Sequence, residues 1–325
     1  MVKRLAVLAA VVLACRGSDP RPVVPHAGSA APAAVASDPW QATAASPDDP
    51  PSLAERHKLA DEWCPSVTGP YFFRVEKAGK TSYLLGTRHV SVPLAKFPEV
   101  VRTQLRAAKL AVFEVAPDDH SSIDRPDYSL PDKLGPVLWA HYGELVGKSA
   151  AHSIENGRAS TALIQAMVLY EDISAMLDIE IEHEVAADHI PARGLETAAF
   201  QDDLLDRLLD LRMLRVELEQ TKDRKEIEQD SHDDLAEYCA GTDDSPGTDA
   251  KTRAMFMRGG YTKEEIDQMD DLMVFQRNAA WIPELEKIFA TGDAFIAVGA
   301  DHLIGDKGVV SLLRGRGFTV TRIRN

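Results

Sequence analysis

Apolar and polar positions in the N-terminal half of the folded part repeat with two different periods. Residues 71–76 and 81–86 are rich in aromatic and β-branched side chains and are joined by Lys-Ala-Gly-Lys, which predicts a β-hairpin. Residues 98–109 carry apolar side chains three and four positions apart, which predicts a helix beginning near Pro98. The apolar run 110–115 is typical of a strand buried on both faces of a parallel sheet, although Glu114 lies within it.

Helical spacing dominates the middle of the chain. Residues 160–171, 176–188 and 197–214 each have apolar positions at intervals of three and four, which predicts three helices. Residues 190–197 interrupt them and predict a short strand or loop ending at Glu196. Residues 217–237 alternate acidic and basic side chains with few apolar ones, which we interpret as a solvated helix face.

The C-terminal part returns to the first pattern. Residues 294–298 predict a buried strand, 305–314 a helix and 318–323 a last strand. The predicted class is therefore α/β, with a largely parallel sheet and a large helical insertion at about 128–290.

The N-terminus has the pattern of an export signal. Lys3 and Arg4 precede an apolar run that ends at Ala14, and this run is too short to span a membrane. Residues 12–15 resemble a bacterial lipobox, in which Cys15 is lipidated; a plain signal peptide with an incidental cysteine is the alternative. Residues 15–54, rich in Ala, Pro and Ser, predict a disordered tether. We therefore expect a signal at 1–14, a folded domain at 55–325 and a lipoprotein anchored to a bacterial membrane, in the periplasm or at the cell surface.

Charge and cysteine content exclude several classes of protein. The chain has 36 Lys and Arg against 51 Asp and Glu, a net charge of −15, so nucleic acid is not expected as a partner. Three cysteines without a C-x-x-C pair exclude thiolate zinc sites and iron–sulfur clusters. If Cys15 is lipidated, Cys64 and Cys239 remain in a compartment where disulfides persist, and we expect them to pair. Two separate buried thiols are the alternative.

Two predicted strands end in the same motif. Gly86-x-x-His89 and Gly299-x-x-His302 each follow an apolar strand, and the carboxyl ends of parallel strands meet in one crevice. Glu114 lies in a third strand, where a buried carboxylate without a cation costs several kcal/mol. Two neutral imidazoles and a carboxylate are a common ligand set for a catalytic divalent metal. The alternative is that these histidines are structural hydrogen-bonding residues.

The motifs occur in the order found in a known family. Residues 83–89, 97–100, 111–115, 194–197, 277–278, 297–303 and 317–320 together resemble the TraB/GumN family over about residues 70–325. This family is related to the Tiki proteases, in which two Gly-x-x-His motifs and an intervening Glu mark a metal-dependent site, and more distantly to erythromycin esterase-like hydrolases. The resemblance implies a duplicated, largely parallel α/β core with the site between its halves. Arg88 and Asp301 depart from the apolar or small residues usual before the two histidines.

Together these features predict an exported metal-dependent hydrolase acting on a peptide or small-molecule substrate, most simply a peptidase. His89 and His302 are expected to bind Mn²⁺, Co²⁺ or Zn²⁺. Glu114 completes the ligand set or acts as general base, and Glu196 takes the other role. Arg277 is expected to stabilise an oxyanion or hold a substrate carboxylate. The alternatives are a metal-free esterase-like hydrolase with a histidine base, and a surface lipoprotein that binds a ligand without chemistry.

Overall fold

The computed structural model describes residues 49–121, 126–242 and 246–324. The expected export signal, Cys15 and most of the expected tether lie outside these residues. Within them, no helix is both long enough and apolar enough to cross a membrane.

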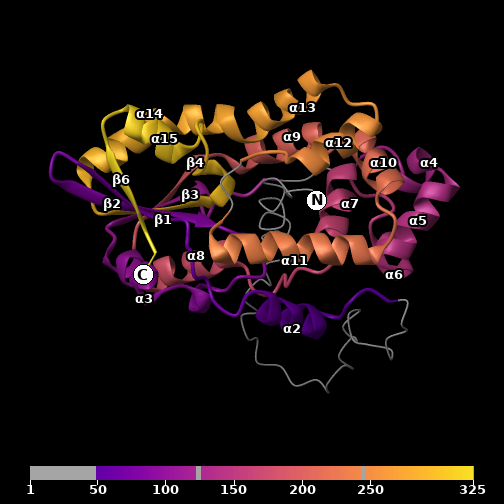
Figure 1. Ribbon diagram of the computed structural model, residues 1–325, viewed down its shortest axis with the longest axis horizontal. Coiled ribbons are helices and arrows are strands. Elements are labelled where there is room, and N and C mark those ends of the chain that lie inside the picture. Colours follow the sequence, from indigo (N-terminus) through magenta and orange to yellow (C-terminus); the bar gives the residue numbers. More distant parts are fainter. Residues whose placement is uncertain (1–48, 122–125, 243–245, 325) are drawn as a thin grey trace, which may run out of the picture.

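A six-stranded sheet forms the centre of the α/β part (Figure 1), in the order β4-β3-β5-β2-β1-β6. β2 pairs with β5, β5 with β3 and β3 with β4 in parallel, whereas β1 pairs antiparallel with β2 and β6. The α/β class with a mostly parallel sheet is therefore confirmed. The strands are β1 (Phe72–Lys77), β2 (Lys80–Thr87), β3 (Leu110–Val115), β4 (Ala192–Glu196), β5 (Ala294–Gly299) and β6 (Thr319–Ile323).

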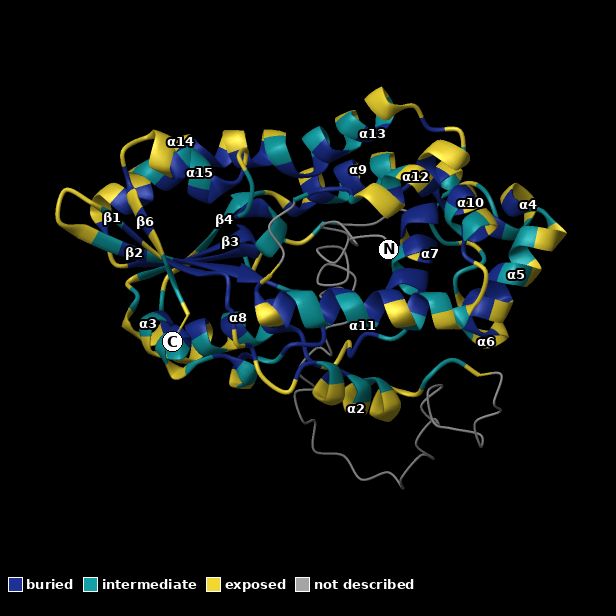
Figure 2. Cartoon of the chain, in the orientation of Figure 1, coloured by how far each residue is buried: buried dark blue, intermediate teal, exposed yellow. Residues whose placement is uncertain are grey.

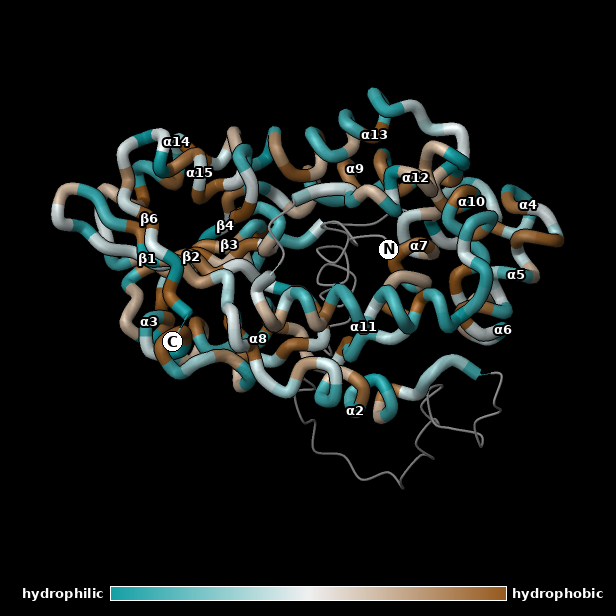
Figure 3. Tube along the Cα trace, in the orientation of Figure 1, coloured by the Kyte–Doolittle hydropathy of each residue, from teal (hydrophilic) through white to brown (hydrophobic). Residues whose placement is uncertain are grey.

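Helices cover both faces of this sheet. In Figure 1, α14 (Gln276–Thr291) and α15 (Val309–Gly315) lie above it, and α3 (Glu99–Ala107) and α8 (Leu177–Ala187) lie below. β5 is buried along its whole length, and β3 is buried from Ala111 onward (Figure 2), as expected for inner parallel strands. The apolar character of these inner strands is visible as brown segments in Figure 3.

A second, helical core lies beside the α/β part. It is built from helices of the predicted insertion and has its own cluster of buried apolar side chains. Its helices are α4 (Leu130–Leu134), α5 (Pro136–Val146), α6 (Lys148–Ser153), α7 (Ala159–Met167), α9 (Ala198–Leu208), α10 (Leu211–Gln220), α11 (Arg224–Ala240), α12 (Ala250–Arg258) and α13 (Lys263–Asp270). A π-helical turn, η2 (Asp271–Phe275), joins α13 to α14, and 3-10 turns η1 (Leu94–Lys96) and η3 (Ala300–His302) follow β2 and β5.

Two of the expected helices differ from the structure. The helix expected over 197–214 is divided into α9 and α10, because the Asp210 side chain accepts a hydrogen bond from the Met213 backbone N–H and starts a new helix. The interpretation of residues 217–237 as one solvated face is also wrong. The chain breaks at 221–223, and α11 buries a stripe at Ile227, Ser231 and Leu235, four residues apart.

A disulfide joins the first described helix, α2 (Leu53–Trp63), to the end of α11. Cys64 follows α2 directly and is bonded to Cys239, with their Cα atoms 6.0 Å apart. Both residues are buried in the core of the α/β part. The Thr68 and Gly69 backbone N–H groups also donate to the Cys239 carbonyl, so this junction is fixed by backbone contacts as well.

We expect removal of this disulfide to lower stability without changing the fold. The bond closes a loop with a sequence separation of 175 residues, for which chain entropy gives at most about 5 kcal/mol. The test is chemical denaturation of the Cys64→Ser/Cys239→Ser variant with and without reductant. The variant should unfold at a lower denaturant concentration than oxidised wild type and be insensitive to reductant. Equal midpoints for oxidised wild type and the variant would contradict the expectation.

Candidate active site

The ends of β2 and β5 lie next to each other. They pair in parallel with Thr87 opposite Gly299, so the two Gly-x-x-His motifs leave the sheet side by side. A methyl group on Gly86 would lie 2.9 Å from the Cα of Ala300, so only glycine allows this approach. Neither Gly86 nor Gly299 has a positive φ, so a left-handed backbone conformation is not what requires glycine at these positions. The absence of a side chain leaves space for Ala300 beside Gly86 and for the Glu114 carboxylate beside Gly299.

Each histidine is held through its Nδ1 atom. Nδ1 of His89 lies 2.7 Å from Oδ2 of Asp178, and Nδ1 of His302 lies 2.6 Å from Oδ1 of Asn278. Since both partners are oxygen acceptors, Nδ1 carries the proton in each ring and Nε2 is left to face the interior of the cluster. Asp178 comes from α8 and Asn278 from α14, so helices orient side chains that the sheet supplies.

The two Nε2 atoms and Glu114 converge beside Gly299. A methyl group placed on Gly299 would lie 3.2 Å from Oε1 of Glu114 and 3.7 Å from Nε2 of His89. Nε2 of His302 is itself 3.7 Å from the same carboxylate oxygen. The three expected metal ligands therefore share one small region at the carboxyl ends of β2, β3 and β5.

Arg277 lies at the centre of this cluster with 3% of its surface exposed. Its Nη2 donates to Glu114 (2.5 Å) and Glu196 (2.6 Å), and its Nε donates to Glu196 at 3.1 Å. Its Nη1 donates to the Met273 carbonyl (2.9 Å) and to Nε2 of His302 (3.1 Å). Every guanidinium N–H thus has a protein acceptor, and Arg277 serves as the counter-ion of two buried carboxylates.

A π-helical turn helps to hold the Arg277 side chain in position. Asp271–Phe275 directly precedes α14, and the Met273 carbonyl in this turn accepts one of the Nη1 hydrogen bonds. One turn further along α14, Trp281 packs its ring 4.5 Å from the ring of His302. Such π-helical turns are rare, and they often occur at functional sites.

Glu196 is fully occupied by hydrogen bonds. Its oxygens accept from Arg277, from Nε2 of Gln201 at 3.1 Å and from Nε1 of Trp281 at 3.2 Å. Burial raises the pKa of Glu196, and Arg277 opposes that effect. Its contacts are those of a residue that holds Arg277 in place.

Glu114 is bound differently. Oε2 accepts from Arg277 and from Gln201 (3.0 Å), whereas Oε1 accepts the Gly299 backbone N–H (2.8 Å) and faces the histidines. Burial alone would raise the pKa of Glu114, but Arg277, the two histidines and the Gly299 N–H together hold it well below its usual range. Glu114 therefore stays ionised, with one oxygen directed towards the histidines.

The two imidazoles have opposite preferences for charge. Burial and the nearby Arg277 guanidinium lower the pKa of His302 to about 3, so its ring is neutral. Burial also acts to lower the pKa of His89, but the Asp178 and Glu114 carboxylates outweigh it and the pKa is raised. The cluster therefore favours positive charge at His89, in the form of a proton or of another cation.

Several of these contacts involve residues to which no sequence motif assigns a role. Asp178, Gln201 and Trp281 lie outside the motifs, and Asn278 lies within one beside Arg277. Asp178 and Gln201 are buried beside the apolar residues of α8 and α9, so each breaks an apolar helical stripe. A polar side chain at an apolar position of the helical period is the signal that points to them.

The donor atoms suit a divalent cation in their chemistry. In the described part of the chain, no three His, Cys, Asp or Glu side chains are arranged to hold a metal ion as they stand. At this cluster Nη1 of Arg277 donates to the lone pair of His302 that a metal needs. The 3.7 Å between Nε2 of His302 and Oε1 of Glu114 is close to the separation of about 3.4 Å expected for two ligands of one tetrahedral ion. Binding thus requires Arg277 to release His302.

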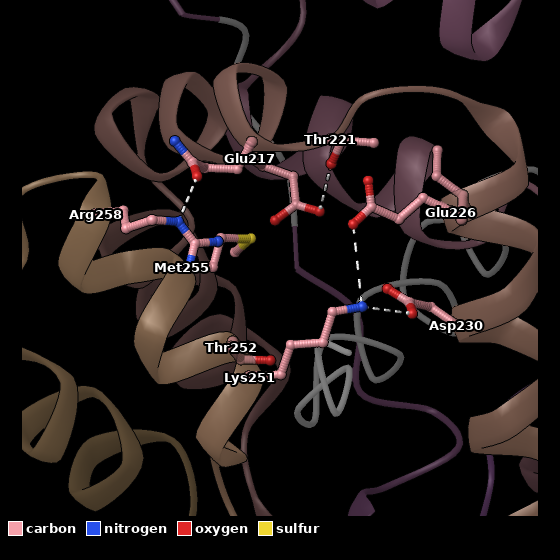
Figure 4. Close-up of a pocket in the computed structure, with 10 residues that line it drawn as sticks. Glu217, Thr221, Glu226, Asp230, Lys251, Thr252, Met255 and Arg258 are labelled. Carbon is pink, nitrogen blue, oxygen red and sulfur yellow. Dashed lines mark hydrogen bonds and ion pairs between the residues drawn. The ribbon is translucent and has the colours of Figure 1, made fainter.

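Two pockets lie in the helical part, away from this cluster. The larger, about 690 Å³, lies between the α5–α6 junction and the start of α11. The smaller, about 40 Å³, is shown in Figure 4, where the Lys251 ammonium lies 3.3 Å from Asp230 and 4.0 Å from Glu226. Neither pocket is lined by a residue of the cluster, and we place the candidate site at the strand ends instead.

We expect Arg277→Met to destabilise the protein by about 3–5 kcal/mol, because it leaves Glu114 and Glu196 buried without their counter-ion. Urea denaturation measures the loss. The double variant Arg277→Met/Glu196→Gln should recover part of it, since one unpaired charge is removed. Arg74→Met, which breaks an exposed ion pair with Glu76, is the matched control and should change stability by less than about 0.5 kcal/mol. An equally small effect of Arg277→Met would show that the cluster charges are not buried.

Comparison with known proteins identifies the family of the chain. A family model described as the TraB/PrgY/gumN family matches residues 71–322, a range that contains both Gly-x-x-His motifs, Glu114, Glu196 and Arg277. Searches of curated proteins and of solved structures gave no match. The match to the family model covers well over half of the chain. The chain therefore belongs to the TraB/PrgY/gumN family, as its motifs indicated.

Proposed function

We propose that this protein is a metal-dependent hydrolase, most simply a peptidase, with its reaction centre at the His89, Glu114 and His302 cluster. One observation carries the proposal. Two imidazoles, each held at Nδ1, direct Nε2 towards an ionised carboxylate oxygen at the carboxyl ends of parallel strands. Ligands of open α/β sheets bind at this edge.

His89, His302 and Glu114 would hold the ion, for which Mn²⁺, Co²⁺ and Zn²⁺ suit nitrogen and oxygen donors. Bound there, the ion would lower the pKa of a water molecule towards about 7 and polarise a substrate carbonyl. Both imidazoles are hydrogen-bonded at Nδ1, and such support of metal ligands by hydrogen bonds is a general feature of metal sites.

Substrate approaches from the side of His89 and Glu114. These two residues retain 7% and 8% exposure, whereas His302 and Arg277 retain 1% and 3% and lie deeper. When Arg277 releases His302, its Nη1–H is free to donate to a carbonyl oxygen, which is the role expected from the sequence. Glu196 keeps Arg277 in position for this. The choice of a peptide substrate rests on the resemblance to the Tiki proteases.

A metal-free hydrolase is the second candidate, and a specific contact favours it. The Asp178 carboxylate on Nδ1 of His89 is the arrangement in which a histidine acts directly as general base. In this case Arg277 keeps its hydrogen bond to His302 throughout.

Metal analysis of protein purified without chelator distinguishes the candidates. We expect about one equivalent of divalent metal, lost in His89→Ala and in His302→Ala, because each variant removes one ligand. His183→Ala, on the exposed side of α8, is the matched control and should keep its metal. Full metal occupancy in both cluster variants would contradict the assignment. Metal-free protein that hydrolyses peptides or esters in the presence of chelator supports the second candidate, and absence of both metal and hydrolysis supports ligand binding without chemistry.

We propose further that the protein is exported and anchored through a lipid on Cys15. The support is the sequence pattern of residues 1–15. Wild type expressed in a bacterium should enter the detergent phase on phase separation, and Cys15→Ala should remain unprocessed or move to the aqueous phase. Wild type found wholly in the aqueous phase would indicate a secreted protein without an anchor.

A further inference from the structure

The exit of β2 is held by side chains of the helical insertion. Five of the six positions from Gly86 to Ser91 form hydrogen bonds with it. The Gly86 carbonyl accepts from Tyr238 (2.8 Å), and Thr87 and His89 both donate to Asp178 (2.8 and 2.7 Å). Arg88 and Ser91 both donate to Glu171 (2.9 and 2.6 Å). Asp178 is the only residue in this set that contacts the side chain of a proposed ligand.

We propose that Asp178 is a positioning residue, which keeps a proton on Nδ1 of His89 and thereby directs Nε2 into the reaction centre. The inference rests on the proposed role of His89, but it concerns a residue outside the ligand set and can be tested without metal or substrate.

The two carboxylate oxygens of Asp178 accept hydrogen bonds from different residues. Oδ1 accepts the Thr87 hydroxyl, which belongs to the last residue of β2, and Oδ2 accepts Nδ1–H of His89 two residues later. The carboxylate is thus fixed relative to the strand by one oxygen and relative to the imidazole by the other. A rotation of the His89 ring about its χ angles would break the second contact.

The helix supports a negative charge at this place. Asp178 is the second residue of α8, with 8% of its surface exposed, and no side chain caps that helix end. A carboxylate in the first turn interacts favourably with the helix dipole, which offsets part of the cost of burial. Oδ2 of Asp178 thus accepts Nδ1–H of His89 in the first turn of α8.

An imidazole without a fixed acceptor at Nδ1 exchanges its proton between both nitrogens. In the form with the proton on Nε2, the ring presents a donor where the reaction centre needs a lone pair. Loss of an equivalent supporting residue typically weakens metal binding 10- to 100-fold. Asp178 thus connects the helical insertion to the chemistry of the sheet.

Nuclear magnetic resonance of protein labelled with ¹⁵N histidine tests the proposal in metal-free protein. We expect a low-field proton bound to Nδ1 of His89, protected from solvent exchange, assigned by its absence from His89→Gln. The signal of this proton should disappear in Asp178→Ala. In Asp178→Asn, which keeps the size of the side chain, the signal should shift or broaden. The asparagine variant provides the test if the alanine variant does not fold. Asp188→Ala, exposed at the end of the same helix, should leave it unchanged.

A second measurement determines the affinity for Zn²⁺ by competition with a chromophoric chelator. We expect the folded Asp178 variants to bind Zn²⁺ 10- to 100-fold more weakly than wild type. Absence of the protected proton from wild type, or its persistence in both Asp178 variants, overturns the inference. If the proton behaves as expected but no variant or wild type binds metal, Asp178 positions His89 and only the metal proposal fails.

Discussion

Arg277 lies between two buried carboxylates, and the rest of the candidate site is arranged around that charge. A guanidinium or a carboxylate alone at this depth would cost several kcal/mol, and removal of one partner leaves the others uncompensated. Glu114 on β3, Glu196 at the end of β4 and Arg277 on α14 must therefore come together in the folded state, although 163 residues separate the first from the last. The π-helical turn before α14 and the donors from Gln201 and Trp281 support the same ion-pair network.

This network makes the two histidines chemically different. Burial and the nearby Arg277 guanidinium lower the pKa of His302 and keep its ring neutral, whereas the carboxylates of Asp178 and Glu114 raise the pKa of His89 and favour a positive charge there. The preference of His89 for positive charge is compatible with both the metal-dependent and the metal-free hydrolase. A metal ion at His89 satisfies the carboxylates as a proton does, and a histidine that readily takes up a proton suits a general base. The contact that separates the two cases is the hydrogen bond between Arg277 and Nε2 of His302.

The parts of the fold that depend on local sequence could be predicted, and those that depend on distant partners could not. The apolar runs that form β3 and β5 and the two Gly-x-x-His motifs are visible in the chain. The break before α10 was missed because a single capping aspartate outweighed a continuous apolar period. The buried stripe of α11 was hidden among charges, and the close approach of Gly86 to Ala300 involves residues more than 200 positions apart. Asp178 interrupts the apolar stripe of α8, but its role becomes evident only once its partner His89 is placed beside it.

The sheet and the helices contribute different residues to the cluster. The proposed ligands His89, Glu114 and His302 all lie on or directly after strands. The residues that orient or neutralise them, Asp178, Gln201 and Arg277, lie on α8, α9 and α14, within or beside the insertion. A sheet without these helices would bring the ligands together, but it would leave Glu114 without a counter-ion and His89 without a fixed tautomer. The helical insertion is therefore part of the candidate site, and changes in its helices act on the same three side chains that the sheet provides.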